Sequence, residues 1–286
     1  MKFKRIYIEI SNVCNLNCPF CIKSTRERKI MSLEDFTSYA TQARKYSEYI
    51  YLHVLGEPLL HPDFPAILRV CSKLGFKVNI TTNATLLAEK KNIILNTDCV
   101  RQVNISLHGY NPQTHGELKK WLDGLVDFAK DFSERGGYTV FRFWTMGKNN
   151  EVYENDLKSM QLLSSLTESN INIYENRLSR SITLRDKIFV SFDKEFKWPS
   201  INDEIISENG RCHGARDMIA ILADGTVVPC CLDGDGACSL GNLKESTLSE
   251  IIASNRFQNM KNGFLNGKLT EELCKKCSYR LRFNRV

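Results

Sequence analysis

The sequence of 286 residues lacks a long apolar run, which excludes one large class of proteins. No stretch approaches the roughly 20 apolar residues that a membrane-spanning helix needs. The first eleven residues, MKFKRIYIEIS, alternate like a strand and carry charge at once, which excludes a secretory signal peptide. We therefore expect a cytoplasmic protein with no membrane partner.

The sequence also lacks strong charge and repetition. The formal net charge is only +6, and the lysines of KKNII and LKKW fall on expected helix faces, where lysines are usually solvated. A nucleic-acid partner is therefore not favoured. Neither an internal repeat nor a low-complexity segment is found, and the composition is that of an ordinary globular protein. A chain of this length can bury a full core, as one large domain or as a large and a small one.

Cysteine, by contrast, is abundant. The chain has 11 cysteines, and in a reducing compartment clustered thiols bind metal more often than they form disulfides. The odd number also argues against complete pairing. Three cysteines lie within the eight residues CNLNCPFC near the start, and six more lie between positions 212 and 277. The sequence therefore offers two candidate metal centres.

Short β-branched runs alternate with amphipathic stretches through the first 175 residues. Strands are expected at 5–11, 49–55, 76–82, 100–107, 138–144 and 170–176, and helices at 32–47, 63–75, 83–94, 112–134 and 154–166. This alternation predicts an α/β fold with a parallel sheet, either open and doubly wound or curved into a partial (β/α)6 barrel. In both arrangements the chemistry lies at the carboxyl ends of the strands, and the first cysteine loop follows the first strand.

The last third of the chain changes character. Residues 176–211 are polar and weakly periodic, and we expect a connector there, with Trp198 a candidate for the wall of a site. A hairpin is expected over 217–231 with Asp224 and Gly225 at its turn, followed by helices over 246–254 and from about 270. The expected organisation is a barrel domain at 1–175, a connector at 176–211 and a small α+β domain at 212–286.

The first thiol group consists of Cys14, Cys18 and Cys21, with the spacing C-x3-C-x2-C. Three thiolates on one loop can hold three irons of a four-iron cluster and leave the fourth iron open to an exogenous ligand. A structural zinc site with a distant fourth cysteine is the alternative, although zinc knuckles favour C-x2-C pairs.

This loop resembles the signature of the radical S-adenosylmethionine superfamily. LGEPLLHPD, after the second expected strand, resembles the GGE motif of that family, with Leu55 in place of the first glycine. The resemblance covers roughly residues 5–175. It implies that S-adenosylmethionine chelates the open iron through its amino and carboxylate groups. It also implies that reductive cleavage yields a 5′-deoxyadenosyl radical, which abstracts a hydrogen atom from a substrate.

The resemblance further implies a set of cofactor contacts. Gly56 and Glu57 would bind the methionine ammonium, and the backbone of Phe20 would meet adenine. Polar residues at strand ends resemble the family's contacts to ribose and carboxylate: Thr82, Asn83, Ser106 and Arg142. Arginine suits the carboxylate because it can pair with it in a bidentate manner. Ordinary packing is the alternative for Phe20, and helix capping is the alternative for the strand-end residues.

The second thiol group has the layout C-x12-G-x4-C, a gap, then C-x2-C, formed by Cys212, Cys230, Cys274 and Cys277. This layout resembles the twitch domain, the shorter form of the SPASM extension of the same superfamily. It implies an auxiliary four-iron cluster with all four corners ligated, while a closed zinc site of four cysteines is the alternative. The further cysteine block of a full SPASM domain is missing, so we expect two [4Fe-4S] clusters in all.

Several residues have no role in this scheme. Cys231 and Cys238 are expected to be small buried residues, or hydrogen-atom donors such as some epimerases of the superfamily use. Cys230 and Cys231 are adjacent and must point opposite ways on a strand, so both are not expected to bind one cluster. His53 and His108 lie at strand ends and are candidates for substrate contact, with hydrogen bonding inside the fold as the alternative.

The layout resembles most the aminocyclitol dehydrogenases of this subgroup. It predicts a two-electron oxidation of a small alcohol or sugar, with hydrogen abstraction, loss of a proton to a base and transfer of one electron to the auxiliary cluster. A one-electron reductant such as flavodoxin or ferredoxin is then an expected partner. One alternative is a maturase that epimerises a ribosomal peptide, crosslinks it or forms a thioether in it, although no leader-binding module precedes the first strand. The other alternative is a non-enzymatic zinc or iron–sulfur binding protein.

Overall fold

The computed structural model describes residues 1–22, 24–146, 154–171, 181–194 and 196–283. The chain divides into two compact units, Met1–Lys77 with Phe196–Val286, and Val78–Glu195. We describe each unit by itself. Within the described ranges, no helix has the length and apolar character that crossing a membrane requires.

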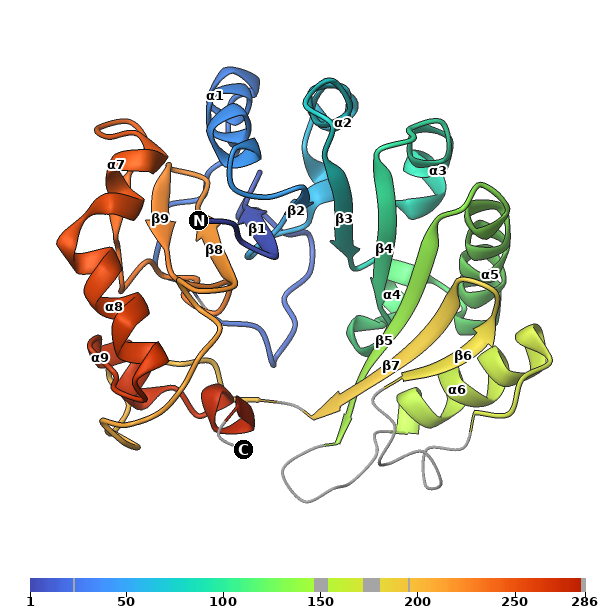
Figure 1. The fold of residues 1–286 in the computed structure, drawn as a ribbon. Helices are drawn as coiled ribbons and strands as arrows, with labels where there is room; N and C mark the ends of the chain where they lie inside the picture. Colours follow the sequence, from blue (N-terminus) through green and yellow to red (C-terminus); the bar gives the residue numbers. More distant parts are fainter. Residues whose placement is uncertain (23, 147–153, 172–180, 195, 284–286) are drawn as a thin grey trace. The chain divides into compact units, whose positions relative to one another are not determined.

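The first unit joins the start and the end of the chain in one sheet (Figure 1). Its strands are β1 (Arg5–Ile8), β2 (Tyr49–Tyr51), β8 (Met218–Ile221), β9 (Thr226–Val228) and β10 (Gly241–Asn242), in the order β10-β9-β8-β1-β2. β1 runs parallel to both β2 and β8, and the β8–β9 and β9–β10 pairs are antiparallel. The C-terminal hairpin therefore extends the sheet that begins with β1.

Helices of this unit come from both ends of the chain. They are α1 (Leu33–Arg44), α2 (Phe64–Lys73), α7 (Leu248–Ala253), α8 (Asn255–Leu265) and α9 (Glu272–Lys276), with 3-10 turns η1 (Pro58–Leu60) and η3 (Tyr279–Phe283). Ile6 and Ile8 of β1 and Phe36 of α1 are fully buried. Burial of each such side chain contributes about 1.5–3 kcal/mol. The core thus fixes β1, whose end begins the cysteine loop.

Local signals in the sequence match the observed boundaries here. Ser32 caps α1, and its Oγ accepts a hydrogen bond from the backbone N–H of Asp35 at 3.0 Å. Gly75 follows α2 at a φ of +69°, as expected for the residue that ends a helix. The hairpin turn lies at Asp224 and Gly225, and Asp224 Oδ1 accepts from Thr226 N at 3.0 Å.

The second unit is a mixed sheet with helices. Its strands are β3 (Lys77–Thr82), β4 (Val100–Ser106), β5 (Tyr138–Met146), β6 (Ser181–Arg185) and β7 (Ile188–Lys194), in the order β3-β4-β5-β7-β6. All neighbours pair in parallel except β6 and β7. The helices are α3 (Leu87–Leu95), α4 (Pro112–His115), α5 (Leu118–Glu134) and α6 (Glu154–Thr167), with the 3-10 turn η2 (Leu107–Gly109).

Two predictions from the sequence differ from the structure of this unit. The helix expected over 112–134 is broken at Gly116, whose φ of +73° interrupts the helical path. Of the strand expected at 170–176, positions 172–176 lie outside the described residues. The stretch expected to be a connector instead contains the β6–β7 hairpin, and β7 pairs in parallel with β5. Ile188 and Val190 are buried at alternate positions of β7, a strand pattern that the surrounding polar residues obscured.

Candidate metal centres and cofactor site

The three-cysteine loop leaves β1 and returns beside it. Met31 N donates to Ile10 O at 2.9 Å, and Asn12 N donates to Lys29 O at 3.1 Å. The Asn12 side chain closes the base of the loop again, since Oδ1 accepts from Lys29 N at 2.7 Å and Nδ2 donates to Glu27 O at 2.8 Å. The loop therefore has a fixed base, and its outer part carries the thiols.

Those thiols are accessible. Cys14 and Cys21 are exposed, and Cys18 is half-buried. Cys21 N donates to Cys18 O at 3.2 Å, so the chain turns back within the cysteine segment. Among the described residues, no three His, Cys, Asp or Glu side chains are grouped closely enough to hold a single metal ion. A donor set of three soft thiolates on an exposed turn fits an iron–sulfur cluster.

The Gly56–Glu57 segment packs directly on the start of this loop. Gly56 has a φ of +76°, and a Cβ atom there would lie 2.3 Å from Ser11 O and 2.9 Å from Val13 O. Glu57 N donates to Val13 O at 2.9 Å. The Glu57 carboxylate is buried, and its Oε1 accepts from Leu59 N at 3.0 Å. The two residues predicted to bind the methionine ammonium therefore lie at the base of the cysteine loop, and their role stays a prediction.

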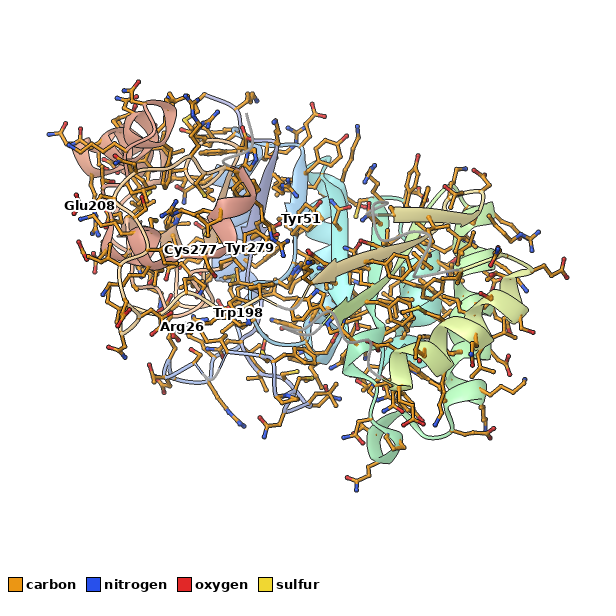
Figure 2. The ribbon with its side chains drawn as sticks, turned by 90° about the horizontal axis from the view of Figure 1, so that it is seen from below. Arg26, Tyr51, Trp198, Glu208, Cys277 and Tyr279 are labelled. Carbon is orange, nitrogen blue, oxygen red and sulfur yellow. The ribbon has the colours of Figure 1, made fainter. Side chains whose placement is uncertain are left out.

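Trp198 reaches the same loop from the expected connector. Its Nε1 donates to the backbone carbonyl of Phe20 at 3.1 Å. A carbonyl has a second acceptor position, so this bond leaves Phe20 able to meet adenine. The Phe196 ring lies tilted against Trp198 at 5.4 Å and edge-on to Tyr279 at 5.0 Å, ring centre to ring centre (Figure 2 labels Trp198, Tyr279 and Cys277). An aromatic chain thus links the cysteine loop to the segment that follows Cys277.

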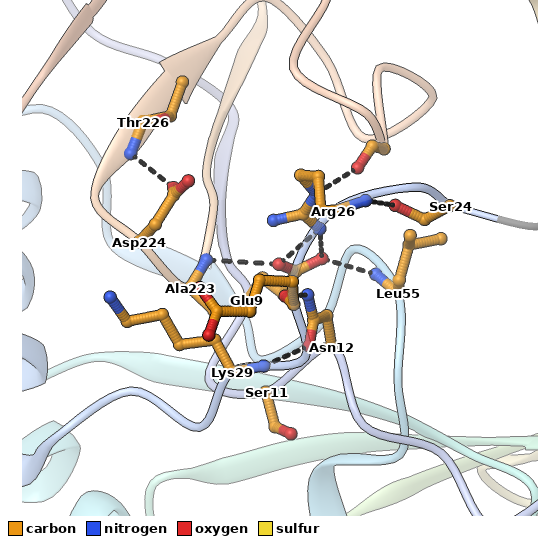
Figure 3. Close-up of polar contacts among 12 residues, drawn as sticks. Glu9, Ser11, Asn12, Ser24, Arg26, Lys29, Leu55, Ala223, Asp224 and Thr226 are labelled. Carbon is orange, nitrogen blue, oxygen red and sulfur yellow. Dashed lines mark hydrogen bonds and ion pairs between the residues drawn. The ribbon is translucent and has the colours of Figure 1, made fainter.

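A buried ion pair, missed by the sequence analysis, holds the loop to the rest of the unit (Figure 3). Arg26 Nη2 lies 2.7 and 2.8 Å from the two carboxylate oxygens of Glu9, whose side chain is 0% exposed. Glu9 also accepts from Leu55 N at 3.0 Å and from Ala223 N at 3.1 Å. Arg26 Nε donates to Gly234 O at 2.7 Å. The signal in the sequence was an acidic residue between Ile8 and Ile10 in an otherwise apolar strand.

In the second unit, two of the predicted contacts lie opposite each other. Ser106 at the end of β4 pairs in register with Arg142 of β5. Asn104, two residues before Ser106, shares its face by strand alternation, and its Nδ2 donates to Thr81 Oγ1 at 3.2 Å. Thr81 therefore belongs to this polar face, and the sequence analysis did not single it out.

Thr82 and Asn83 make local turn contacts. Thr82 Oγ1 accepts from Ala84 N at 2.9 Å, and by alternation its side chain lies on the face of β3 that carries the buried Ile80. Asn83 Oδ1 accepts from Thr85 N at 3.0 Å. These bonds stabilise the turn after β3 and do not cap the next helix, because α3 has Leu86 at its N-cap and no side-chain cap hydrogen bond. The predicted cofactor contacts of Thr82, Asn83, Ser106 and Arg142 stay predictions.

The two candidate histidines are embedded in aromatic surroundings. His108 stacks on Trp144 with ring centres 4.3 Å apart, and its Nδ1 lies 3.2 Å from Arg142 O. Burial, helped by the Arg142 charge, lowers the pKa of His108 to about 3, so the ring is neutral near pH 7. His53 lies against the rings of Tyr7 and Tyr51, with ring centres 5.6 and 6.2 Å away.

The four thiols of the second group are half-buried, and the charge of one acts on the pKa of another. Cys212 and Cys230 flank the β8–β9 hairpin, and Cys274 and Cys277 lie in and just after α9. Burial raises the pKa of Cys230 well above its usual value, and the nearby thiol of Cys212 adds to the rise. Burial also raises the pKa of Cys212, with Cys277 adding to it. Grouped thiols whose charged forms are this unfavourable fit a site in which a bound cationic centre stabilises them as thiolates.

The two remaining cysteines of the C-terminal domain, Cys231 and Cys238, have different neighbours. Cys231 packs with Tyr7 and Leu55, and burial raises the pKa of the Tyr7 hydroxyl, which also hydrogen-bonds to Cys231. Cys238 instead is buried against the second thiol group, since a hydrogen bond with Cys238 and burial raise the pKa of Cys274. Cys230 and Cys231 therefore have different neighbours, although they follow β9 and do not lie on a strand as expected, and Cys238 is a fifth thiol beside the predicted four.

Gly56→Ala is expected to disrupt the first centre, because its Cβ collides with backbone oxygens of the cysteine loop. Iron analysis of anaerobically reconstituted protein should fall from about eight to about four atoms per chain, as two four-iron clusters become one. Gly136→Ala is the matched control, since Gly136 also has a positive φ, of +88°, but open space at its Cβ position. Equal iron content in both variants would contradict the tight packing of Gly56 on the loop.

Adjacent thiols provide a second test. Cys230→Ala should lose about four iron atoms per chain, because Cys230 faces the second thiol group. Cys231→Ala should retain about eight, because its thiol faces Tyr7 on the opposite side. Iron and sulfide analysis measures both. Loss of iron in Cys231→Ala, or retention in Cys230→Ala, would contradict the assignment.

Comparisons with curated proteins find partial relatives. The chain is 37% identical over 91 residues to the tungsten-containing aldehyde ferredoxin oxidoreductase cofactor-modifying protein of Pyrococcus furiosus, covering 30% of this chain and 26% of that one. It is 31% identical over 109 residues to the PqqA peptide cyclase of Streptomyces rochei, covering 37% and 30%. The matched segment thus spans less than a third of either relative. A probable GTP 3′,8-cyclase of Sulfolobus acidocaldarius is 22% identical over 269 residues, 85% of each chain.

Solved structures show the same fold over most of the chain. BtrN in complex with AdoMet and 2-DOIA covers 97% of this chain and 94% of that one, with a TM-score of 0.59 and 16% identity. Streptococcus suis SuiB bound to the precursor peptide SuiA covers 97% and 71%, with a TM-score of 0.61 and 16% identity. At these identities the likeness shows the fold alone. The predicted α/β class is confirmed, and BtrN, a 2-deoxy-scyllo-inosamine dehydrogenase, matches the resemblance to aminocyclitol dehydrogenases that the cysteine layout suggested.

Family profiles match both cysteine-bearing regions. The profile of the Radical SAM superfamily matches residues 8–159, which include the three-cysteine loop and Gly56–Glu57. The SPASM profile, an iron-sulfur cluster-binding domain, matches residues 212–278, which include the second thiol group. These domains imply S-adenosylmethionine and [4Fe-4S] clusters as cofactors. The chain belongs to the radical S-adenosylmethionine superfamily and carries a SPASM iron–sulfur cluster-binding domain.

Proposed function

We propose that this radical S-adenosylmethionine enzyme is an oxidoreductase that removes two electrons from a carbinol of a small alcohol or sugar. The observation that carries the proposal is the second thiol group, in which Cys212, Cys230, Cys274 and Cys277 are half-buried and lie near enough for the charge of one to raise the pKa of another. Four thiolates close every corner of a four-iron cluster, so the centre has no position for substrate and suits an electron acceptor. When bound, the first cluster and S-adenosylmethionine supply the 5′-deoxyadenosyl radical that abstracts the carbinol hydrogen.

The first unit provides the groups that would hold the methionine moiety. Glu57 is a buried carboxylate whose Oε1 is fixed by Leu59 N, and a buried carboxylate binds a cation such as an ammonium group favourably. Gly56 lets the backbone approach the cysteine loop closely. These residues would position S-adenosylmethionine, so that its reacting bond lies at a fixed place relative to the three-cysteine loop.

One face of β1 provides polar groups for the substrate. Ile6 and Ile8 face one side of the sheet, and Tyr7 lies on the other by alternation, where it is buried beside Leu55 and Leu222. Tyr51 lies 4.8 Å from Tyr7, ring centre to ring centre, and His53 lies edge-on to both. Hydroxyl and imidazole groups on one face suit a hydroxylated substrate, and His53 is the candidate to receive the proton that leaves with oxidation.

Two adjacent cysteines connect this face of β1 with the second thiol group. The Cys231 thiol hydrogen-bonds with Tyr7, and the adjacent Cys230 faces the predicted auxiliary site. One hydrogen bond and one peptide link therefore join the aromatic face to the proposed electron acceptor. An external one-electron donor such as flavodoxin or ferredoxin would reduce the first centre, and a cytoplasmic location would keep the thiols reduced.

Peptide modification is the second candidate function. It is favoured by the likeness in fold to SuiB bound to its precursor peptide and by the partial identity to the PqqA peptide cyclase. In this case the same first centre would act on a side chain of a ribosomal peptide. A peptide substrate and a small carbinol are distinguished by which compound raises the yield of 5′-deoxyadenosine.

Anaerobic incubation with S-adenosylmethionine and dithionite tests the proposal. We expect 5′-deoxyadenosine, with a higher yield when an aminocyclitol or sugar alcohol is added. A carbinol deuterated at its reacting carbon should pass deuterium to 5′-deoxyadenosine and give a ketone about three mass units lighter than the labelled carbinol, since one deuterium and one proton leave. A rise in yield only with peptides would favour the second candidate, and protein containing zinc without iron would contradict both.

Removal of one thiol of the second group should separate formation of 5′-deoxyadenosine from formation of the ketone. Cys277→Ala is expected to form 5′-deoxyadenosine but to lose most of the ketone, because the acceptor is missing. Cys71→Ala is the control, since Cys71 is fully buried in α2. Equal ketone yield per 5′-deoxyadenosine in Cys277→Ala and the wild type, measured by mass spectrometry, would contradict the role of the second centre as acceptor.

A further inference from the structure

Arg280 is a buried cation that the reaction scheme does not use. Its side chain lies in η3 and is among the largest fully buried ones, at 1% exposure. A buried guanidinium is costly unless its charge is compensated and its donors are satisfied. Its partners therefore indicate why the fold keeps it.

Those partners are neutral. Arg280 Nε donates to Cys274 O at 3.0 Å, Nη1 donates to Asn209 O at 3.2 Å and Nη2 donates to Ser207 O at 3.2 Å. Carbonyl oxygens satisfy the N–H donors but do not neutralise the positive charge. Over the ranges that the structure describes, no ion pair joins Arg280 to a carboxylate.

The groups near Arg280 that become negative when they ligate iron are the thiols of the second group. Nε is bonded to the carbonyl of Cys274, which is itself one of the four. Arg280 follows Cys277 by three residues, and its guanidinium also binds the carbonyls of Ser207 and Asn209, which lie shortly before Cys212. The backbone N–H groups of Tyr279 and Arg280 also donate to the Cys277 sulfur. One residue therefore contributes both a charge and a backbone hydrogen bond to this site.

We propose that Arg280 is the counter-charge of the auxiliary centre and raises its reduction potential. This inference rests on the proposed presence of an iron–sulfur cluster at the second thiol group. Four thiolates outweigh the positive charge of the cluster core, so the bound centre is anionic, and each added electron makes it more so. A fixed buried cation stabilises the more negative reduced form more strongly, which makes the centre a better electron acceptor.

Arg256 offers a contrast within the same domain. Its charge also acts on Cys238, but half of its side chain is exposed and Glu271 pairs with it, with Nη2 to Oε2 at 2.7 Å. An exposed and already neutralised cation has little effect on a buried centre. Arg256→Gln is therefore the matched control for Arg280→Gln.

The experiment is a redox titration of the auxiliary centre in the reconstituted full chain, followed by its electron paramagnetic spectrum without substrate. Arg280→Gln, which keeps donors but loses the charge, should make reduction about tenfold less favourable, a fall of about 59 mV for one electron. Arg280→Lys, which keeps the charge but loses the planar donor set, should stay close to the wild type. Arg256→Gln should also stay close.

Every outcome of the titration is decisive. An unchanged potential in Arg280→Gln, or an equal shift in Arg280→Lys, would overturn the role of the charge. If Arg280→Gln loses the auxiliary iron while Arg280→Lys keeps it, the site requires the charge, which supports the proposal. If both variants lose the iron equally, the geometry of the guanidinium is what matters, and the proposal fails. A wild type without auxiliary iron would contradict the proposed function itself, which separates that failure from these.

Discussion

A buried carboxylate determines how the first unit is assembled. Glu9 has no exposure, and a buried charge persists only when it is paired and hydrogen-bonded. Its partners are the Arg26 guanidinium and the backbone N–H groups of Leu55 and Ala223. The return leg of the cysteine loop, the segment before Gly56 and the C-terminal hairpin must therefore meet at the end of β1. Loss of one member of such a pair costs about 3–5 kcal/mol.

This meeting point also connects the surroundings of the two thiol groups. Arg26 comes from the loop that carries the first group, and its Nε binds the carbonyl of Gly234, which lies between Cys230 and Cys238. Leu55 packs on the same glycine, since an added Cβ at Gly234 would lie 3.1 Å from Leu55 Cδ1. Leucine stands where the related motif has glycine, and Gly234 leaves room for it. The departure from the motif thus has a structural reason in the C-terminal domain.

Periodicity and spacing predicted what depends on local sequence. Alternation located β1 and β4, Ser32 marked the start of α1, and Asp224 with Gly225 marked the hairpin turn. The cysteine spacings predicted both thiol groups. Long-range partners were not predictable in this way. Neither the burial of Glu9 against Arg26 nor the position of Arg280 beside the second thiol group follows from a local pattern, because each depends on segments that are distant in the chain.

The two thiol groups differ in accessibility. The more accessible first group suits a cluster that binds S-adenosylmethionine, and the second suits a cluster that accepts an electron. Cys14 and Cys21 are exposed on a loop of three thiols, whereas all four auxiliary thiols are half-buried. The central claim is that one iron at the first loop has no protein thiolate and is bound by S-adenosylmethionine. Iron Mössbauer spectroscopy of the reconstituted wild type, with and without S-adenosylmethionine, tests it most directly. The account predicts that one iron of about eight changes its signal on addition. Spectra that are identical in the presence of excess S-adenosylmethionine would contradict it.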